Sequence, residues 1–162
     1  MQKIIIIGCP GSGKSTLSRA LHEKTKLPLY HLDMMYWNAD KTTVEKQVFR
    51  ERLAEVLKQD EWIIDGNYGA TMEMRIQQCD TVIFLDYPLE ICLDGVSQRH
   101  GKPRSDMPWV KSAEQDEEFI EFIKNYNEQS KPKVLKLLET YAHKNIFIFH
   151  SRQETESFLN QL

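Results

Sequence analysis

The segment Gly8 to Ser15, with the sequence GCPGSGKS, constrains this chain more than any other feature. It matches the pattern G-x-x-x-x-G-K-[ST] at every position. The apolar, β-branched run Ile4 to Ile7 comes before it and predicts a strand that is buried on both faces. Helical spacing follows from about Lys14 to Lys26. A glycine-rich loop between a strand and a helix can turn successive backbone N–H groups toward phosphate oxygens.

We therefore expect this loop to bind the triphosphate of ATP together with Mg²⁺. A chance match of the pattern arises in roughly one in a hundred chains of this size, and the flanking strand and helix argue against it. In this chemistry Lys14 places its cation on the β- and γ-phosphates, and Ser15 offers its hydroxyl to Mg²⁺. The residues expected to contact the nucleotide here are Gly8, Pro10, Gly11, Ser12, Gly13, Lys14, Ser15 and Thr16.

Strand and helix patterns alternate over most of the chain, which predicts an α/β fold whose parallel sheet has helices on both faces. Thr42 with Glu45, Ser112 with Gln115, and Ser151 with Glu154 each form a capping-box pattern that predicts a helix start. No linker divides the chain, so we expect one domain over residues 1–162. Besides the first strand, strands are expected at residues 27–32, 62–65, 81–86 and 146–149.

A polar, basic segment around residues 99–112 contains Gly101 and Pro103 and reads as a surface loop or lid inserted in this domain. Phosphoryl transfer relies on positioning and charge stabilisation, often by cations from a mobile lid. We therefore predict that Arg99 and Arg104 neutralise the transferred group. The alternative for each is a solvated surface arginine.

Aspartates stand at the ends of three predicted strands: Asp33, Asp65 and Asp86. In an open α/β sheet, ligands bind beyond the carboxyl ends of the strands. We predict Asp65 in the magnesium shell and Asp33 as the catalytic group that faces the acceptor hydroxyl. Asp86 reads as structural. Capping of the next element is the alternative for each aspartate.

The acceptor side is expected to include residues near the ends of the second and third strands. Asn67 and Arg75 follow Asp65 in the turn and the segment after the third strand. Trp37, near the end of the second strand, can stack on an acceptor ring, although packing is the favoured reading for such aromatics.

Composition limits the partners. The 162 residues carry a net charge of −3 and a pI near 6.0, without the basic excess that non-specific DNA binding uses. No apolar run approaches the ~20 residues of a membrane helix. Three cysteines without metal-ligand spacing indicate reduced thiols and a cytoplasmic protein. A small-molecule acceptor is the expected partner, and the oligomeric state stays open.

Four stretches carry a resemblance to a known family. The phosphate loop, WIIDGNY (62–68), VIFLDYP (82–88) and the arginine-containing lid resemble the adenylate kinase and shikimate kinase branch of P-loop kinases. HLDMMYW (31–37) with WIIDGNY resembles more closely the bacterial topology modulation proteins, which are related to adenylate kinase.

The resemblance implies a P-loop NTPase fold: a three-layer sandwich with a five-stranded parallel sheet of order 2-3-1-4-5. It also implies ATP and Mg²⁺ as ligands and a lid arginine at Arg99. The adenine site would lie around residues 151–153, where Arg152 would contact the nucleotide.

The chain departs from adenylate kinases on the acceptor side. They carry an arginine shortly after the second-strand aspartate, where Met34 and Met35 stand here, and D-G-F-P-R after the third strand, where Gly66 is followed by Asn67. Three hypotheses follow: an ATP-dependent phosphotransferase acting on a small molecule, a nucleotide-dependent regulator without dedicated turnover, and a DNA-binding protein, which the charge balance disfavours.

Overall fold

Five strands form an all-parallel sheet in the order β2-β3-β1-β4-β5, in a computed structural model that describes residues 1–99 and 117–162. The predicted α/β sheet and its strand order are therefore confirmed. The strands are β1 (Lys3–Gly8), β2 (Leu29–His31), β3 (Trp62–Asp65), β4 (Thr81–Leu85) and β5 (Asn145–Phe149).

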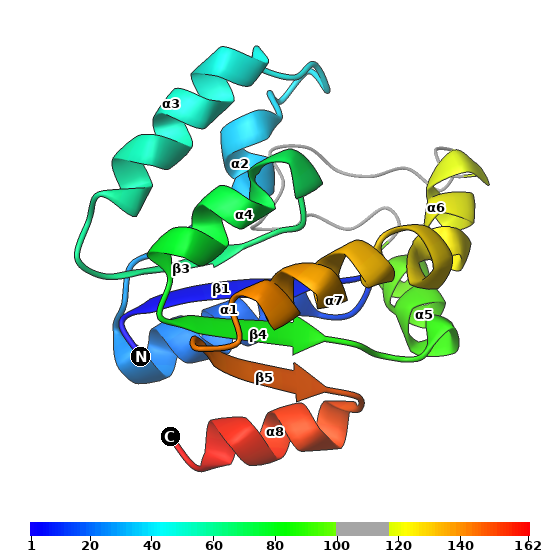
Figure 1. The fold of residues 1–162 in the computed structure, drawn as a ribbon. Helices are drawn as coiled ribbons and strands as arrows, with labels where there is room; N and C mark the ends of the chain where they lie inside the picture. Colours follow the sequence, from blue (N-terminus) through cyan, green and yellow to red (C-terminus); the bar gives the residue numbers. More distant parts are fainter. Residues whose placement is uncertain (100–116) are drawn as a thin grey trace.

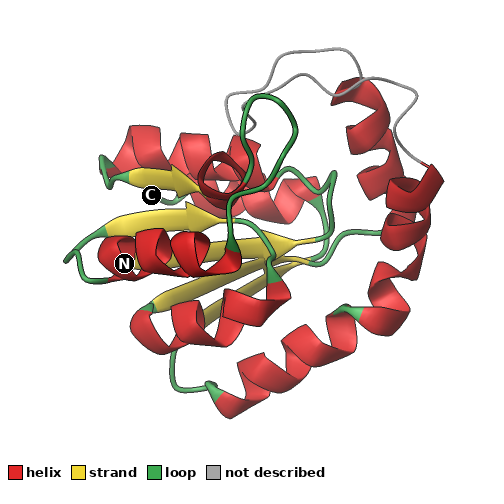
Figure 2. Cartoon of the chain, turned by 90° about the horizontal axis from the view of Figure 1, so that it is seen from above, coloured by secondary structure: helices red, strands yellow, loops and turns green. Residues whose placement is uncertain are grey.

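Helices cover both faces of the sheet, as Figures 1 and 2 show. Helix α1 packs against β1, β2, β3 and α8, whereas α4 and α7 lie over the opposite face. Within residues 1–99 and 117–162, no helix combines the length and the hydrophobicity of a membrane span. The helices are α1 (Lys14–Thr25), α2 (Leu32–Tyr36), α3 (Lys46–Leu57), α4 (Gly69–Gln78), α5 (Leu89–Arg99), α6 (Glu117–Gln129), α7 (Lys131–Thr140) and α8 (Arg152–Asn160).

The central strand β1 carries the core. Ile4, Ile5, Ile6 and Ile7 are all 0% exposed, as expected for a strand with helices on both sides. The register aligns Ile6 with Asp65 of β3, and Asp65 in turn with His31 of β2. The strand ends that carry polar residues therefore meet at one edge of the sheet, beside the loop that follows β1.

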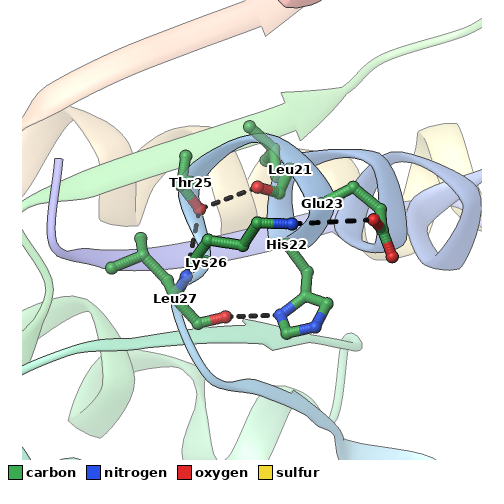
Figure 3. A network of polar contacts seen from close by, with 6 residues as sticks. All are labelled: Leu21, His22, Glu23, Thr25, Lys26 and Leu27. Carbon is green, nitrogen blue, oxygen red and sulfur yellow. Dashed lines mark hydrogen bonds and ion pairs between the residues drawn. The ribbon is translucent and has the colours of Figure 1, made fainter.

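Helix α1 ends in a compact set of polar contacts, drawn in Figure 3. Lys26 adopts the left-handed conformation (φ 61°), and its N–H donates to His22 O at 2.8 Å. Thr25 Oγ1 donates to Leu21 O at 2.7 Å, and His22 Nδ1 donates to Leu27 O at 2.6 Å. The Lys26 bond satisfies the His22 carbonyl, which the helix end would leave without a partner, and the other two bonds hold the turn, so α1 stops here and the chain turns toward β2.

The predicted bounds of the second strand were wrong at both ends. The second strand covers Leu29–His31 and not residues 27–32, because a helical turn, α2, begins at Leu32. A short apolar run cannot tell a strand from a buried helical turn.

Thr42 does not cap α3, which begins at Lys46. Its hydroxyl lies 2.5 Å from Asp40 Oδ1 and 3.0 Å from Asn38 Nδ2, so it forms hydrogen bonds within the loop that precedes α3 and not with the helix. The Ser112–Gln115 pattern lies outside the described residues.

The cap at Ser151 is confirmed. Its Oγ accepts the backbone N–H of Glu154 at 3.2 Å, and the Glu154 carboxylate accepts the N–H of His150 at 2.8 Å. The bond returning from Glu154 thus goes to the residue before the cap, in a variant of the reciprocal capping pattern.

Leu21 anchors α1, and with it the residues that follow the glycine-rich loop, in the core. Because Leu21 is 0% exposed, we expect Leu21→Ala to lower the free energy of unfolding by about 2–5 kcal/mol in urea denaturation. Leu135→Ala is the control, since Leu135 is 40% exposed, and we expect it to change stability by less than about 0.5 kcal/mol. Equal effects of the two substitutions would contradict this assignment of the core.

Candidate functional site

The loop between β1 and α1 curls tightly against α5. Gly11 has a φ of 84°, and a Cβ added to it would lie 1.9 Å from the carbonyl oxygen of Cys92. A Cβ added to Gly95 would in turn lie 2.1 Å from Gly11 O. Two glycines thus allow the backbones of the loop and of α5 to touch. The positive φ at Gly11 is shared by Gly8 (154°) and Gly13 (97°).

Lys14 folds back over the start of this loop. Its Nζ donates to Gly8 O at 2.9 Å and to Cys9 O at 3.3 Å. The ammonium group therefore lies where the curl of the backbone meets the N-terminal end of α1, at which the helix dipole also favours an anion. Of the residues predicted to contact the nucleotide, Gly8 and Pro10 to Gly13 lie at the end of β1 and in this loop, and Lys14 to Thr16 lie in the first turn of α1.

The side chains of the loop differ in exposure. Ser15 is half-buried and Thr16 is exposed, both in the first turn of α1. Ser12 is only 1% exposed, and its hydroxyl packs against Gly8, where an added Cβ would lie 3.0 Å from Ser12 Oγ. The Ser12 backbone N–H donates to Cys9 O at 3.1 Å, whereas its buried hydroxyl has no hydrogen-bond partner among the described residues.

Asn67 ties the end of β3 to the start of the loop. Its Nδ2 donates to Gly8 O at 2.6 Å, and its Oδ1 accepts the N–H of Gly8 at 3.1 Å. Both polar groups of the Asn67 amide are thus engaged with the backbone of Gly8. The structure gives this predicted acceptor-binding residue the role of positioning the phosphate loop.

Cys9 packs between the loop and α5. A hydrogen bond to the side chain of Cys92, together with burial, raises the pKa of the Cys9 thiol. The same hydrogen bond lowers the pKa of the Cys92 thiol. Cys9 is 5% exposed and Cys92 is 0% exposed, so both side chains fill the space under the loop.

Asp65 is 5% exposed and joins β2, β3 and α1. His31 Nδ1 lies 2.6 Å from Asp65 Oδ2, and Ser18 Oγ donates to the same oxygen at 2.5 Å. Ser18 Oγ also lies 2.9 Å from the carbonyl oxygen of Ser15. Ser18 therefore connects the carboxylate to the helical turn that carries Ser15.

The donors present fit a magnesium ion bound with a triphosphate. Such an ion takes most of its ligands from phosphates and water and needs only one or two groups from the protein. Ser15 supplies a hydroxyl, and Asp65 keeps Oδ1 without a hydrogen bond from the described residues. Residues 1–99 and 117–162 hold no cluster of three His, Cys, Asp or Glu side chains, so an all-protein metal cage is not part of this region.

Arg75 does not face open space. It is 0% exposed, and its guanidinium donates to the backbone carbonyls of Gly66 at 3.0 Å and Tyr68 at 3.2 Å, and also to that of Asn67. Burial lowers the pKa of Arg75 to about 9, partly offset by the nearby Asp65 carboxylate, so it stays protonated at neutral pH. This predicted acceptor residue shapes the loop after β3 from within the protein.

Asp33, in the first turn of α2, is held by Tyr68, which is itself held by Trp37. The hydroxyl of Tyr68 donates to Asp33 Oδ1, and Trp37 hydrogen-bonds to Tyr68. Burial, and next the charge of Asp33, raise the pKa of Tyr68, so this hydroxyl remains a donor. Tyr36 packs against Tyr68, with ring centroids 5.0 Å apart, and against Trp37, with centroids 5.7 Å apart. Trp37 thus lies in an aromatic cluster, and its stacking on an acceptor ring stays a prediction.

Arg152, at the start of α8, lies beside the other end of the phosphate loop. A Cβ added to Gly13 would be 3.3 Å from its Nη1, and its guanidinium lies 5.7 Å from the centre of the Tyr87 ring. An exposed arginine next to the loop and next to an aromatic ring is suited to contact a nucleotide base or sugar.

Most of the lid predicted at 99–112 lies outside the described residues. Arg99 is the last residue of α5, and its side chain and all of Arg104 lie outside the described part of the chain. Asp86 forms an ion pair with Lys131, whose Nζ lies 2.9 Å from Asp86 Oδ2, in agreement with the interpretation of Asp86 as a structural residue.

Sequence reasoning missed several residues that build the site. Gly95 carried a usable signal, because a glycine inside a helical pattern often marks a close backbone approach. His31 and Tyr68 lay within recognised stretches, but their bonds to Asp65 and Asp33 depend on residues 34 and 35 positions away in the chain. Ser18 gave no signal.

Comparison with known families matches residues 4–121 to the AAA domain family (AAA_18). The matched range includes the phosphate loop, Asp33, Asp65 and α5. The chain belongs to the AAA domain family.

This AAA domain is also similar to shikimate kinases. A shikimate kinase of Clostridium beijerinckii is 31% identical over 108 residues, which cover 58% of this chain and 64% of that protein. The AAA domain chain thus spans less than two thirds of the length of that relative.

Two solved structures share the fold of this AAA domain. A shikimate kinase from Bacteroides thetaiotaomicron gives a TM-score of 0.55 at 20% identity, covering 98% of this chain and 94% of that one. A shikimate kinase from Aquifex aeolicus gives 0.54 at 18% identity, covering 98% and 91%. At these identities the likeness establishes a common architecture.

The contact between Gly11 and Gly95 in this AAA domain predicts the effect of a single methyl group. Gly95→Ala forces α5 away from the loop, so we expect a loss of about 1–3 kcal/mol in urea denaturation and weaker binding of a fluorescent ATP analogue. Gly69→Ala is the matched control, because an added Cβ there meets nothing within 4 Å. We expect it to be neutral or to stabilise by up to about 1 kcal/mol. Wild-type stability and binding in Gly95→Ala would disprove the contact.

Proposed function

We propose that this chain is a phosphotransferase that moves the γ-phosphoryl group of Mg-ATP to a hydroxyl of a small molecule. The observation that carries the proposal is Lys14, whose ammonium lies against the Gly8 and Cys9 carbonyls inside a curled loop at the start of α1. A mobile cation in such a curl is the arrangement that grips β- and γ-phosphates. ATP supplies the group that is transferred, and Mg²⁺ neutralises charge on its phosphates.

On the nucleotide side, the loop N–H groups bind phosphate oxygens, and the Lys14 ammonium stays in contact with the γ-phosphoryl group as its charge develops during transfer. Ser15 and Asp65 Oδ1 hold the magnesium ion or its waters. Arg152, beside Gly13, contacts the base or sugar, and Arg99 and Arg104 are predicted to add positive charge over the phosphates. We expect this chemistry to take place in the cytoplasm, where ATP is abundant and the three free cysteines stay reduced.

On the acceptor side, Asp33 orients the hydroxyl that attacks and takes up its proton. The bond from Tyr68 holds the Asp33 carboxylate in one orientation. Arg75 holds the loop that carries Tyr68, because its guanidinium binds three successive carbonyls of that loop. The similarity to a shikimate kinase supports a small hydroxyl compound as the acceptor class.

A nucleotide-dependent regulator is the second candidate. It is favoured by the acceptor side itself, where Asp33 already has a partner in Tyr68 and Arg75 is turned into the protein. A chain of this kind would bind Mg-ATP and change its affinity for a macromolecular partner, as the resemblance to topology modulation proteins implies, without consuming ATP on an acceptor.

The test is acceptor-dependent ADP formation, measured with a panel of small hydroxyl acids, including shikimate, and nucleoside monophosphates. We expect one class of acceptor to support turnover. Lys14→Met should lower kcat/KM at least about 100-fold, because it removes a charge that is needed in the transition state. Lys24→Met, an exposed lysine at the other end of α1, should leave kcat/KM unchanged.

Mg-ATP binding without turnover on any acceptor would overturn the phosphotransferase and leave the regulator. Full activity in Lys14→Met would overturn the assignment of the site itself.

A further inference from the structure

A cavity of about 520 Å³ lies between the N-terminal end of α4 and helices α6 and α7. Figure 1 shows α4 and α7 next to each other over the sheet, with α6 beyond them toward α5. The volume falls in the range of small-molecule sites, roughly 300–1,000 Å³. It belongs to none of the contacts described above, apart from the backbone segment that follows β3.

The cavity is lined by two residues that also contact the proposed site. Asn67 and Tyr68 line it. Asn67 binds the Gly8 carbonyl that also accepts Lys14 Nζ, and Tyr68 binds Asp33. The cavity therefore shares walls with both halves of the proposed site, so a molecule inside it lies next to the groups that would transfer and orient the phosphoryl group.

The cavity contains a buried polar group without a partner. Tyr126 of α6 lines it and is 3% exposed, and its hydroxyl has no hydrogen-bond partner among the described residues. A buried hydroxyl without a partner costs free energy that a bound molecule can recover. We read this hydroxyl as a donor to a polar group of the ligand.

The remaining walls are mostly apolar. Met72, Val134 and Leu137 line the cavity, and Phe122, an aromatic side chain that is 45% exposed, stands beside them. An apolar ring fits such walls, because it removes their surface from water without leaving hydroxyl groups unpaired.

The charge of the cavity lining limits the charged groups that a bound ligand can carry. Of the described residues that line the cavity, Lys133 is the one cation, and none is acidic. The N-terminal end of α4 faces the same space, without an acidic residue in its first turn and without a side-chain cap. One cation and one helix end suit a single negative charge, whereas a phosphate dianion is normally held by several cations.

We infer that this cavity holds the acceptor, and that the acceptor is a hydroxyl compound with an apolar ring and one acidic group. The inference rests on the proposed phosphotransferase for its role and on the cavity for its chemistry. Lys133 binds the acidic group, the apolar walls hold the ring, and Tyr126 donates to a polar atom of the ligand. The acceptor hydroxyl then points toward Lys14 and Asp33.

Binding in the absence of ATP tests the cavity independently of catalysis. The probe is 4-(hydroxymethyl)benzoate, titrated by calorimetry against three comparison compounds: benzyl alcohol, which lacks the charge; quinate, which has the charge on a polar ring; and AMP, which carries two charges. We expect the probe to bind about tenfold more tightly than benzyl alcohol, which is the value of one charge-assisted bond. It should also bind more tightly than quinate, whose ring hydroxyl groups would stay unpaired against apolar walls, and than AMP, whose second charge has no cation.

Two variants assign the contacts. Lys133→Met should remove the advantage of the probe over benzyl alcohol, whereas Lys136→Met, an exposed lysine on the same helix that does not line the cavity, should keep it. Tyr126→Phe should weaken probe binding several-fold and raise the melting temperature of the free protein, because it removes a buried group without a partner. Tyr30→Phe is its control, since the Tyr30 hydroxyl bonds to Gln59 elsewhere.

Tighter binding of quinate or AMP than of the probe, or an unchanged preference in Lys133→Met, would overturn the inference. Failure of the proposed function looks different. In that case the probe binds with the expected preference, but its addition produces no ADP from Mg-ATP.

Discussion

The carbonyl oxygen of Gly8 is the point on which the site depends. It accepts Lys14 from α1 and Asn67 from the end of β3, at 2.9 and 2.6 Å. Gly8 is the last residue of β1, so the buried strand places this carbonyl at the middle of the sheet edge. The loop after β1 must curl back so that the Lys14 side chain can reach the carbonyl. One backbone group thus joins the central strand, the neighbouring strand and the first helix, and it fixes the shape of the phosphate-binding loop.

The other features of the site support that curl or use it. Gly11 and Gly95 let α5 press against the loop from one side. Arg75 holds the carbonyls of the segment that includes Asn67, so a buried cation stabilises the clamp on Gly8 from the acceptor side. A lysine held between carbonyls can move to a triphosphate without rearranging the strands around it, which suits a site that alternates between empty and loaded states.

Local patterns predicted the sheet and the phosphate loop, because the Ile4–Ile7 run and the glycine spacing each depend on neighbouring residues. The position of Asp65 at a strand end could also be predicted, because parallel strands bring their carboxyl ends to one edge of the sheet. Arg75 was harder to predict, because nothing in the sequence tells a buried guanidinium that binds carbonyls from one that faces a ligand. The helical turn after His31 and the use of Thr42 within its own loop depend on tertiary contacts that a short pattern does not contain.

The central claim is that backbone amides of the loop grip a triphosphate. Backbone amide NMR of the full chain, titrated with Mg²⁺ and a non-hydrolysable ATP analogue, tests it most directly. The account predicts that the largest chemical-shift changes fall on the amides of Cys9 and of Gly11 to Ser15, with smaller changes near Arg152. Saturating analogue with no change in those amides, or with the largest changes on a different part of the surface, would contradict it.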